Sequence, residues 1–481
     1  ELFFPPSLPN EPYRAEGPQD FSHLQRATAQ RSMSPATAEA SKATDEAFKG
    51  LQRFCVYKTE DDGKPRRPPF ESAAAAGLKR LDRDCAVIST SAPDPQLTRM
   101  SEHLLSQAGM PATPMAISRQ RGVRLAFLDT HPTGDGVPEK VATSLHGYTL
   151  AHIARHLVCS GVNLESCAAQ ITTRLALPIR KFDRTSRSLT TIDPDHGGGI
   201  GTQGDLATAI FDEVNAWQAA RVAPGGNAPE HLVLNLSVGW DPVLSDGLGK
   251  KQLEDLRAGA QAVYSALRYA STLDVLVLAA SGNRTLCAWC AKGPLLPAAW
   301  EDDPAGATAP VVYGVGGVRS NGKKLRNARR RSMPQRTAYG ENAVVTTFDQ
   351  DHTTWLYTGS SVATAVASSI AAVVWDTDPL LTPAQVMDTL YDSGQPTRFR
   401  AKFWFGGGSA PASHRVSLCP AVKLACDHSG SPSCPVTGEC PSWNRKNPVF
   451  PTWGPQWWVA GACHPWVMPQ PPDPPCPPCE I

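Results

Sequence analysis

The sequence predicts an α/β fold with a mostly parallel central sheet flanked by helices. Short apolar runs alternate with helix-like patterns from about residue 121 to residue 395. This alternation is typical of strands that are covered by helices on both faces. The composition changes on either side of this region, and 481 residues exceed one ordinary domain. We therefore expect one large domain with appendages at both ends.

The expected elements follow from apolar periodicity along the chain. Five apolar runs predict strands, at residues 123–128, 232–236, 275–280, 311–315 and 343–347. The segments between and after them predict helices, at residues 146–158, 205–218, 252–269, 361–375 and 383–392. The helix that opens at His146 carries its apolar side chains on one stripe, as a helix on a sheet requires.

The outer segments predict appendages. Residues 1–85 begin with Pro-rich sequence and then show a helix-like stretch at 36–51 and strand-like pieces at 54–57 and 85–88. We interpret them as an N-terminal extension, either a small α+β unit or a retained propeptide. The main domain is expected at 86–405. Residues 406–481 hold seven cysteines and many prolines, which predicts a disulfide-linked tail.

Charge and hydropathy exclude several function classes. Acidic and basic side chains nearly cancel, at a net charge of +1, so no overall field favours nucleic acid or an anionic membrane. The longest apolar stretch, 362–375, is too short to span a bilayer and contains Ser and Thr. We expect a monomer that has neither a nucleic-acid partner nor a membrane span.

Cysteine content indicates an oxidising compartment. Thirteen cysteines are many for a reduced cytosolic enzyme, although the odd number leaves at least one unpaired in a monomer. Cys159 and Cys167 are candidates to pair across a short loop. The two Cys-x-x-Cys pairs, 287/290 and 476/479, have zinc-knuckle spacing but no clustered His, so disulfides are the better interpretation. We expect a secreted or extracytoplasmic protein.

Ser361 is the candidate nucleophile around which the other assignments are arranged. It follows Gly359-Ser360 and opens a helix of small residues. A serine hydroxyl needs a base to become nucleophilic, and the first turn of a helix offers exposure and backbone N–H groups that favour negative charge. In isolation, this serine would be one more small helix residue.

Three further side chains at strand ends or helix starts complete a site. Asp129 follows the first predicted strand, and His146 opens the first predicted helix. Asn283 lies in a Ser-Gly-Asn turn after the third strand, where its amide can donate to an oxyanion. The chain order Asp, His, Ser is the one used by subtilisin. Taken singly, Asp129 would be a strand-end cap, His146 a polar helix start and Asn283 a turn residue.

A glycine-rich stretch at 197–204 suggests a phosphate loop, but no Lys follows it and no strand leads into it. We interpret it as a flexible loop before a helix.

Five blocks in order resemble the subtilisin-like serine peptidases, the subtilases, over roughly residues 120–395. Leu128-Asp129-Thr130 resembles the aspartate block and His146-Gly147 the histidine block, and 359–364 (Gly-Ser-Ser-Val-Ala-Thr) resembles the serine block. Residues 235–239 (Asn-Leu-Ser-Val-Gly) are similar to the substrate-edge strand, and 279–283 (Ala-Ala-Ser-Gly-Asn) to the oxyanion block.

Three residues depart from the family pattern. His131 stands where the family has Gly, Tyr148 follows His146-Gly147 where the family has Thr-His, and Ala365 replaces a Pro. Only 17 positions separate Asp129 from His146, which is short for the family. We therefore transfer no calcium ligand, and we assign no metal.

The resemblance implies a serine endopeptidase with Asp129, His146 and Ser361 as its triad and Asn283 as its oxyanion donor. It needs no cofactor. The polypeptide substrate is expected beside Ser237, Val238 and Gly239, adding a strand to the sheet. Small residues at 279, 280 and 282 predict an open primary pocket for apolar or bulky side chains, with Ala280 and Gly282 in contact with substrate.

Two alternatives stay open. One is a catalytically silent subtilase fold that acts as a binding module, which would account for the departures near the triad. The other is a non-proteolytic serine esterase with the same triad. Two Asn-x-Ser/Thr sequons include Asn235 and the proposed donor Asn283. A glycan there would block the site, so we expect both to be unmodified, which favours a bacterial exporter.

Overall fold

The structure, a computed structural model, describes most of the central part of the chain and little of its two ends. The described residues are 2–3, 13–15, 56–59, 86–89, 92–94, 101–111, 115, 122–131, 133, 144, 146–160, 166–183, 188–192, 197–223, 228–242, 256–284, 293–302, 310–346, 354–400, 412–430, 434–436 and 438–441. The helix predicted at 36–51 and the two Cys-x-x-Cys pairs lie outside these residues.

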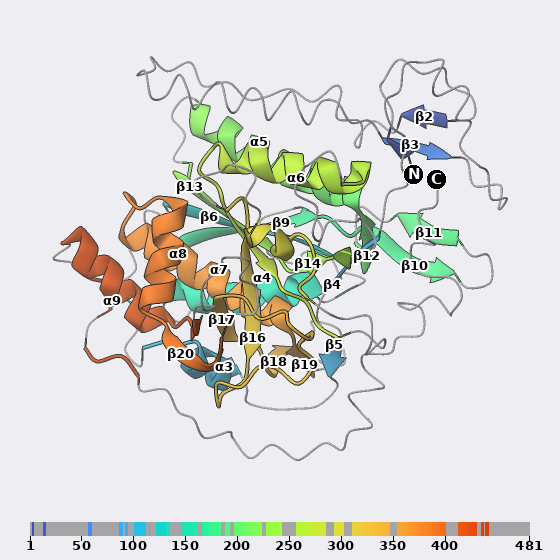
Figure 1. The fold of residues 1–481 in the computed structure, drawn as a ribbon. Coiled ribbons are helices and arrows are strands. Elements are labelled where there is room, and N and C mark those ends of the chain that lie inside the picture. Colours follow the sequence, from blue (N-terminus) through green and yellow to red (C-terminus); the bar gives the residue numbers. More distant parts are fainter. Residues whose placement is uncertain are drawn as a thin grey trace.

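An eight-stranded sheet forms the centre of the molecule (Figure 1). Its order is β20-β21-β17-β16-β15-β13-β6-β9, and every pair is parallel except β20–β21. The strands are β6 (Val123–Asp129), β9 (Ala169–Leu175), β13 (His231–Leu236), β15 (Leu276–Ala280), β16 (Tyr313–Val318), β17 (Arg336–Tyr339), β20 (Gln395–Arg400) and β21 (Ala412–Arg415). The predicted α/β class with a mostly parallel sheet is confirmed.

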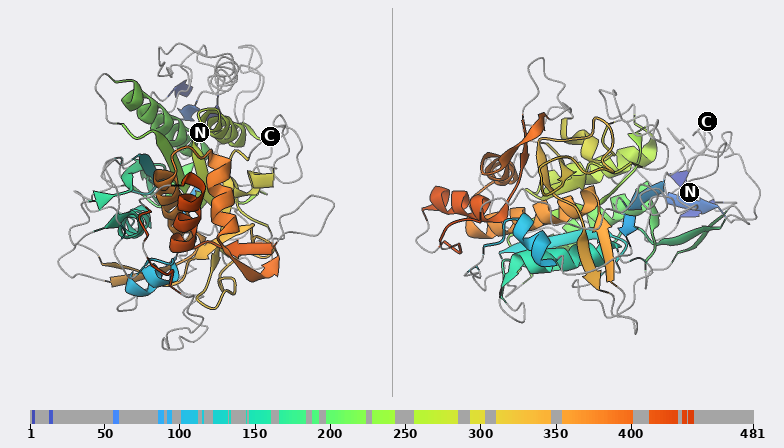
Figure 2. Two further views of the ribbon diagram at one scale, coloured as in Figure 1. Left: turned by 90° about the vertical axis from the view of Figure 1, so that its left-hand side faces the viewer. Right: turned by 90° about the horizontal axis from the view of Figure 1, so that it is seen from below.

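Helices cover both faces of this sheet. Successive residues of β6 point to opposite faces, so that Leu125 and Phe127 belong to one hydrophobic core and Ala126 and Leu128 to the other. The first core is completed by α4 (His146–Val158), α7 (Ser360–Thr377), α8 (Pro383–Asp392) and α9 (Leu418–Ser429). The second is completed by α5 (Gln203–Val222) and α6 (Ala258–Ser271), which lie together on the other side (Figures 1 and 2).

Helix α7 is the most deeply buried of these helices. Every residue from Ser360 to Trp375 is buried. Small side chains such as Ala363 and Ala367 allow the close approach of α4 and of strand β16. This packing fixes the position of the residues at its N-terminus.

Two small antiparallel sheets flank the main one. The first has the order β11-β10-β12-β4-β14, and its strands are β11 (Ser188–Ile192), β10 (Ile179–Asp183), β12 (Ile200–Thr202), β4 (Ala86–Ser89) and β14 (Val238–Gly239). The second is β18-β19-β5, with β18 (Ala343–Thr346), β19 (Thr354–Thr358) and β5 (Ala92–Asp94). The strand predicted at 343–347 therefore exists, but it pairs with β19 and not in the main sheet.

Residues 197–204 also differ from the prediction of a flexible loop. They include β12, and Thr202 caps α5 through a reciprocal pair of hydrogen bonds with Asp205. This capping box satisfies two donors at the helix start. The glycine-rich stretch thus forms a strand edge that leads directly into a helix.

The boundary predicted at residue 406 does not match the structure. Strand β21 pairs with β17 in the main sheet, and α9 packs against α7. Arg415, which is buried, donates to the carbonyl oxygen of Gln107 in α3 (Ser101–Gln107) and so links the tail to the segment before β6. Residues 412–430 belong to the main domain.

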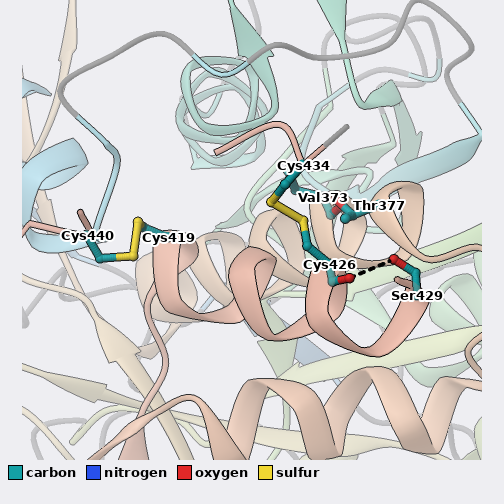
Figure 3. Close-up of a disulfide and its surroundings, with 7 residues drawn as sticks. All are labelled: Val373, Thr377, Cys419, Cys426, Ser429, Cys434 and Cys440. Atoms are coloured by element: carbon teal, nitrogen blue, oxygen red, sulfur yellow. Dashed lines mark hydrogen bonds between the residues drawn. A yellow bond between two sulfur atoms is a disulfide. The ribbon is translucent and has the colours of Figure 1, made fainter. Parts of the chain in front are cut away.

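Three disulfides are present among the described residues. Cys159 pairs with Cys167, as predicted, across β7 (Cys159–Ser160) and β8 (Ser166–Cys167). Cys419 pairs with Cys440 and Cys426 with Cys434, so both tail disulfides hold the segment after α9 against that helix (Figure 3). Disulfides within 419–479 were predicted and are confirmed.

At the N-terminal end, β1 (Leu2–Phe3) and β2 (Tyr13–Ala15) pair with β3 (Val56–Thr59) in a three-stranded sheet. None of the helices in the described part of the chain is long and apolar enough to cross a membrane.

Candidate active site

Asp129 and His146 form a buried hydrogen-bonded pair. Asp129 is the last residue of β6, and His146 is the first residue of α4. His146 Nδ1 lies 2.7 Å from Asp129 Oδ1, and the side-chain exposures are 3% and 0%. Because an ionised carboxylate only accepts hydrogen bonds, Nδ1 carries the proton and Nε2 is left as the basic nitrogen. The Asp–His pair predicted from sequence is brought together.

The turn around Asp129 fixes this pair. The backbone N–H of Thr130 donates to Asp129 Oδ1 at 2.7 Å, and Thr130 Oγ1 accepts from the N–H of Gly147 at 3.0 Å. A Cβ on Gly147 would lie 2.8 Å from the backbone nitrogen of His131. Only glycine permits α4 to begin this close to the end of β6.

Ser361 lies in the first turn of α7 and is buried. Its Oγ donates to the carbonyl oxygen of Ser237 at 3.1 Å. His146 Nε2, in contrast, has no hydrogen-bond partner in the described part of the chain. The ring of Tyr357, four residues before Ser361, lies 6.3 Å from the His146 ring. Helices α4 and α7, which carry the histidine and the serine, pack against each other, and no hydrogen bond joins Ser361 to His146 Nε2.

A hydroxyl–amide network joins the end of β13 to α7. Ser237 Oγ donates to Asn235 Oδ1 at 2.7 Å and to the Ser361 carbonyl at 3.2 Å. Asn235 Nδ2 in turn donates to Ser368 Oγ at 3.1 Å. All of these side chains are buried, so the network holds the strand end and the helix in one register. Asn235 faces the helix and is not available at the surface.

Asn283 is oriented by the residue before the candidate nucleophile. Its Oδ1 accepts from the backbone N–H of Ser360 at 3.0 Å, while Ser360 Oγ accepts from the N–H of Gly282 at 3.0 Å. Gly282 has a φ of +91°, which favours glycine. With Oδ1 occupied, Asn283 Nδ2 is left as a buried donor without a partner among the described residues. An unpaired buried donor is suited to a charge that appears only during reaction.

Ser360 is a site residue that sequence reasoning missed. It was interpreted only as part of the turn before Ser361. Its main chain and side chain bind two successive residues of the 282–283 turn. The serine block itself, with a hydroxyl before the nucleophile, was the available signal.

The predicted substrate strand is already paired with another part of this chain. Val238 and Gly239 of β14 lie opposite Ser89 and Ile88 of β4. On its other edge, β4 pairs with β12 through Ile200, Gly201 and Thr202. An antiparallel strand of the chain therefore occupies the position between β12 and β14. Shortly after β4, strand β5 pairs with β19, which leads into Ser361.

Leu295 lies beside Gly282, one of the small residues from which an open primary pocket was predicted. A Cβ on Gly282 would lie 2.5 Å from Leu295 Cγ, and a Cβ on Gly239 would lie 3.0 Å from Leu295 Cβ. Leu295 therefore fills the space between these two glycines. Ala280 is fully buried at the end of β15. Glycine at 239 and 282 makes room for Leu295.

Two of the residues that depart from the family pattern, His131 and Tyr148, pack together next to the candidate triad. Tyr148 stacks between His131 and His152, with ring centroids 6.2 Å and 5.9 Å apart. His131 is buried and its Nδ1 lies 3.4 Å from Thr173 Oγ1 of β9. Ala365 is fully buried in α7. These residues leave the Asp129–His146 contact intact.

Burial also lowers the pKa of His152 to about 4, with smaller contributions from His156 and Arg155. Burial raises the pKa of Tyr357, near the triad. Among the described residues, no group of three or more His, Cys, Asp or Glu side chains is placed to hold a metal ion.

Comparison with known proteins bears on these motifs. The model of the subtilase family (Peptidase_S8) matches residues 203–408. This region of the chain belongs to the subtilase family. The match includes Ser361, Asn283 and the 237–239 strand end, and it begins after Asp129 and His146. The predicted family resemblance is confirmed.

Solved structures of proteases are also similar to this chain at low identity. The prenylagaramide maturation protease PagA shares 18% identity at a TM-score of 0.39, covering 68% of this chain and 99% of its own. A serine-to-alanine mutant of the protease domain of PatA shares 18% at 0.41, covering 66% and 98%. Sphericase shares 16% at 0.42, covering 66% and 96%. The comparison with curated proteins finds no match.

Proposed function

We propose that this subtilase is a serine endopeptidase with Asp129, His146 and Ser361 as its catalytic triad. The observation that carries the proposal is the buried 2.7 Å contact between Asp129 and His146, with Ser361 in the first turn of the adjacent helix. Asp129 holds the imidazole in one tautomer, so that Nε2 is directed to accept a proton. No cofactor takes part.

The reaction is acyl transfer to water. The Ser361 hydroxyl turns from the Ser237 carbonyl to His146 Nε2, which takes its proton as Oγ attacks the peptide carbonyl. Asn283 Nδ2 and the Ser361 N–H donate to the oxyanion. The imidazolium then protonates the leaving amine. In the second step His146 takes a proton from water, which attacks the acyl-enzyme ester and releases the acid and the Ser361 hydroxyl.

The polypeptide substrate adds a strand beside Ser237, Val238 and Gly239. The support is the pairing of these residues with β4, because the same backbone groups would bind an incoming peptide. Substrate therefore has to replace β4. Ala280 and Gly282 belong to the neighbouring wall of the same cleft.

The N-terminal segment up to β5 is a retained propeptide in this proposal, so it extends past the boundary predicted at residue 85. Its support is the pairing of β4 between β12 and β14 and the pairing of β5 with β19. N-terminal sequencing of chain incubated at neutral pH is expected to find a new terminus between Ser89 and Ala92. Ser361→Ala is expected to stay uncut, whereas Ser369→Ala, which removes a buried hydroxyl in the same helix, is cut normally. A stable, intact and active wild-type chain would contradict this assignment.

The silent-subtilase alternative draws on one observation, the Ser361 hydroxyl bonded to Ser237 and not to His146. Labelling by a fluorophosphonate, which reacts only with an activated serine, separates the two. Comparing casein with short esters separates a peptidase from an esterase. We expect labelling and casein cleavage. Ester cleavage without casein cleavage would favour the esterase.

The protein acts outside the cytoplasm in this proposal, as a secreted bacterial monomer that carries no glycan at Asn235 or Asn283. Its support is the three disulfides and the burial of Asn235, which closes one sequon to modification in the folded state. Sedimentation of the purified chain is expected to give one protomer mass, and a dimer mass would contradict it.

A further inference from the structure

We propose that Leu295 closes the pocket for the substrate side chain on the acyl side of the cleaved bond, so that this residue must be Gly, Ala or Ser. The inference rests on the proposed function and names its substrate class. It replaces the open pocket for bulky side chains that the small residues at 279–282 predicted.

The site geometry locates this pocket. A peptide carbonyl attacked by Ser361 has to direct its oxygen to Asn283 Nδ2, while its backbone runs beside Ser237. The side chain of that residue then enters the space between the two segments. Gly239 borders this space two residues after Ser237, and Gly282 borders it directly before Asn283. Both glycines face the same neighbour, Leu295.

Leu295 fills this space. Its Cγ and Cδ1 lie 2.5 Å and 2.7 Å from the position of a Cβ on Gly282, and its Cδ1 lies 3.3 Å from a Cβ on Gly239. The isobutyl group thus contacts both walls. At these distances no aromatic or long aliphatic side chain fits beside it.

The surroundings keep Leu295 from moving away. Its backbone N–H donates to the Ser281 carbonyl at 3.1 Å, and the next residue, Leu296, exchanges two hydrogen bonds with Trp240 at 3.0 Å. Arg329 Cδ lies 2.9 Å from the position of a Cβ on Gly282, and the buried Arg329 side chain binds Asp241 at 2.8 Å and the Gly293 carbonyl at 2.8 Å. These contacts fix the backbone of residues 295–296 and the wall beside Gly282.

Leu295 and the next residue, Leu296, have different neighbours. Leu296 belongs to the hydrophobic core beneath α5 and α6, whereas the side chain of Leu295 contacts the backbone of Gly282 and Gly239. It is 6% exposed and packs on glycine backbone at the end of two strands. Such a position is typical of a side chain that shapes a binding site.

The test compares two chromogenic peptides, Ala-Ala-Pro-Ala and Ala-Ala-Pro-Phe p-nitroanilide. Rates are divided by the concentration of sites that a fluorophosphonate labels in the full chain. Wild type is expected to cleave the Ala peptide with a kcat/KM at least about 100-fold above that for the Phe peptide. Leu295→Ala is expected to raise kcat/KM for the Phe peptide by about 10- to 100-fold and to change the Ala peptide little.

Leu267→Ala is the matched control, because it removes the same atoms from a fully buried leucine of α6. It should leave the ratio between the two peptides unchanged. Labelled wild-type enzyme that prefers the Phe peptide overturns the inference alone, even where Leu295→Ala fails to fold. A chain that is neither labelled nor active on either peptide overturns the proposed function, and the inference with it.

Discussion

At the residue scale, the site depends on side chains with one polar atom bound and the other left for chemistry. His146 uses Nδ1 for Asp129 and keeps Nε2 available, while Asn283 uses Oδ1 for the Ser360 N–H and keeps Nδ2 available. In each case the bound atom fixes the orientation of the free one. Such preorganisation avoids reorganisation when charge develops in the transition state.

Asn283→Ala tests the oxyanion donor. Because the amide donates only to the developing oxyanion, we expect kcat to fall by roughly 10²–10³ with little change in KM, the magnitude known for the corresponding subtilisin residue. Asn321→Ala, in a surface loop after β16, is the control and should keep wild-type kinetics. An unchanged kcat in Asn283→Ala would show that another group binds the oxyanion.

Single substitutions of the triad should be non-additive. Asp129→Ala, His146→Ala and Ser361→Ala are each expected to remove most activity, and the triple variant should lose little more than Ser361→Ala alone, since the three residues act as a unit. Circular dichroism should show a folded chain for each. If the fold-losses of activity in the single variants multiplied in the combined variants, the residues would act independently, and the prediction would be wrong.

Sequence reasoning could single out these candidate residues because each stands at a strand end or helix start with its own short motif. It could not find Ser360 as the partner of Asn283, because that contact joins positions 77 apart in the chain. It also could not place Leu295 beside Gly282, because Leu295 lies outside the motif.

At the element scale, helix α4 carries both His146 and a second, partly buried histidine. His152 lies further along the same helix, and its pKa is lowered to about 4, chiefly by burial. The folded state therefore binds this proton less readily than the unfolded state, whose pKa is near 6.5. Its neutral form stabilises the fold above about pH 6.5, and this stability is lost as pH falls toward 4.

We expect the free energy of unfolding to fall as the pH is lowered from 6.5 to 4. Protonation of His152 is expected to account for on the order of 2 kcal/mol of this fall. His152→Gln should reduce that fall, as urea unfolding at pH 4.5 and pH 7 would measure. His428→Gln, near the exposed end of α9, is the control. An equal pH dependence in wild type and His152→Gln would contradict the assignment.

Helices were predicted better than strand partners. The bounds of α4 and α8 match the sequence prediction, because their apolar stripes and the Thr382 capping box are local signals. Strand β18 was placed in the wrong sheet, and β4 was found without its partners, since pairing depends on residues far along the chain. Because the segment was assigned to a tail from its Cys and Pro content alone, β21 and α9 were not predicted.

At the scale of the whole molecule, residues 412–430 pack with the main sheet and with α7. Helix α9 is buried against α7, the helix that holds Ser361, and Arg415 joins β21 to α3. A chain ending at residue 405 loses an interior strand of the main sheet and part of the core. We therefore expect it to be insoluble or inactive.

A chain ending at residue 441 should keep wild-type activity and thermal stability, because it retains β21, α9 and both tail disulfides. Melting temperature and casein cleavage of the two truncations measure the difference. Full activity in the chain that ends at 405 would contradict the placement of β21 and α9 in the main domain.

The central claim is that Ser361 is a nucleophile activated by His146 and Asp129. The most direct measurement is incubation of the full chain with a fluorophosphonate, followed by peptide mass mapping over the time in which the N-terminus is cut. The account predicts one adduct, on Ser361, that accumulates as cutting proceeds, is absent in His146→Ala and persists in Ser369→Ala. A chain that is cut and cleaves casein but carries no adduct on Ser361, or an adduct that forms equally in His146→Ala, would contradict it.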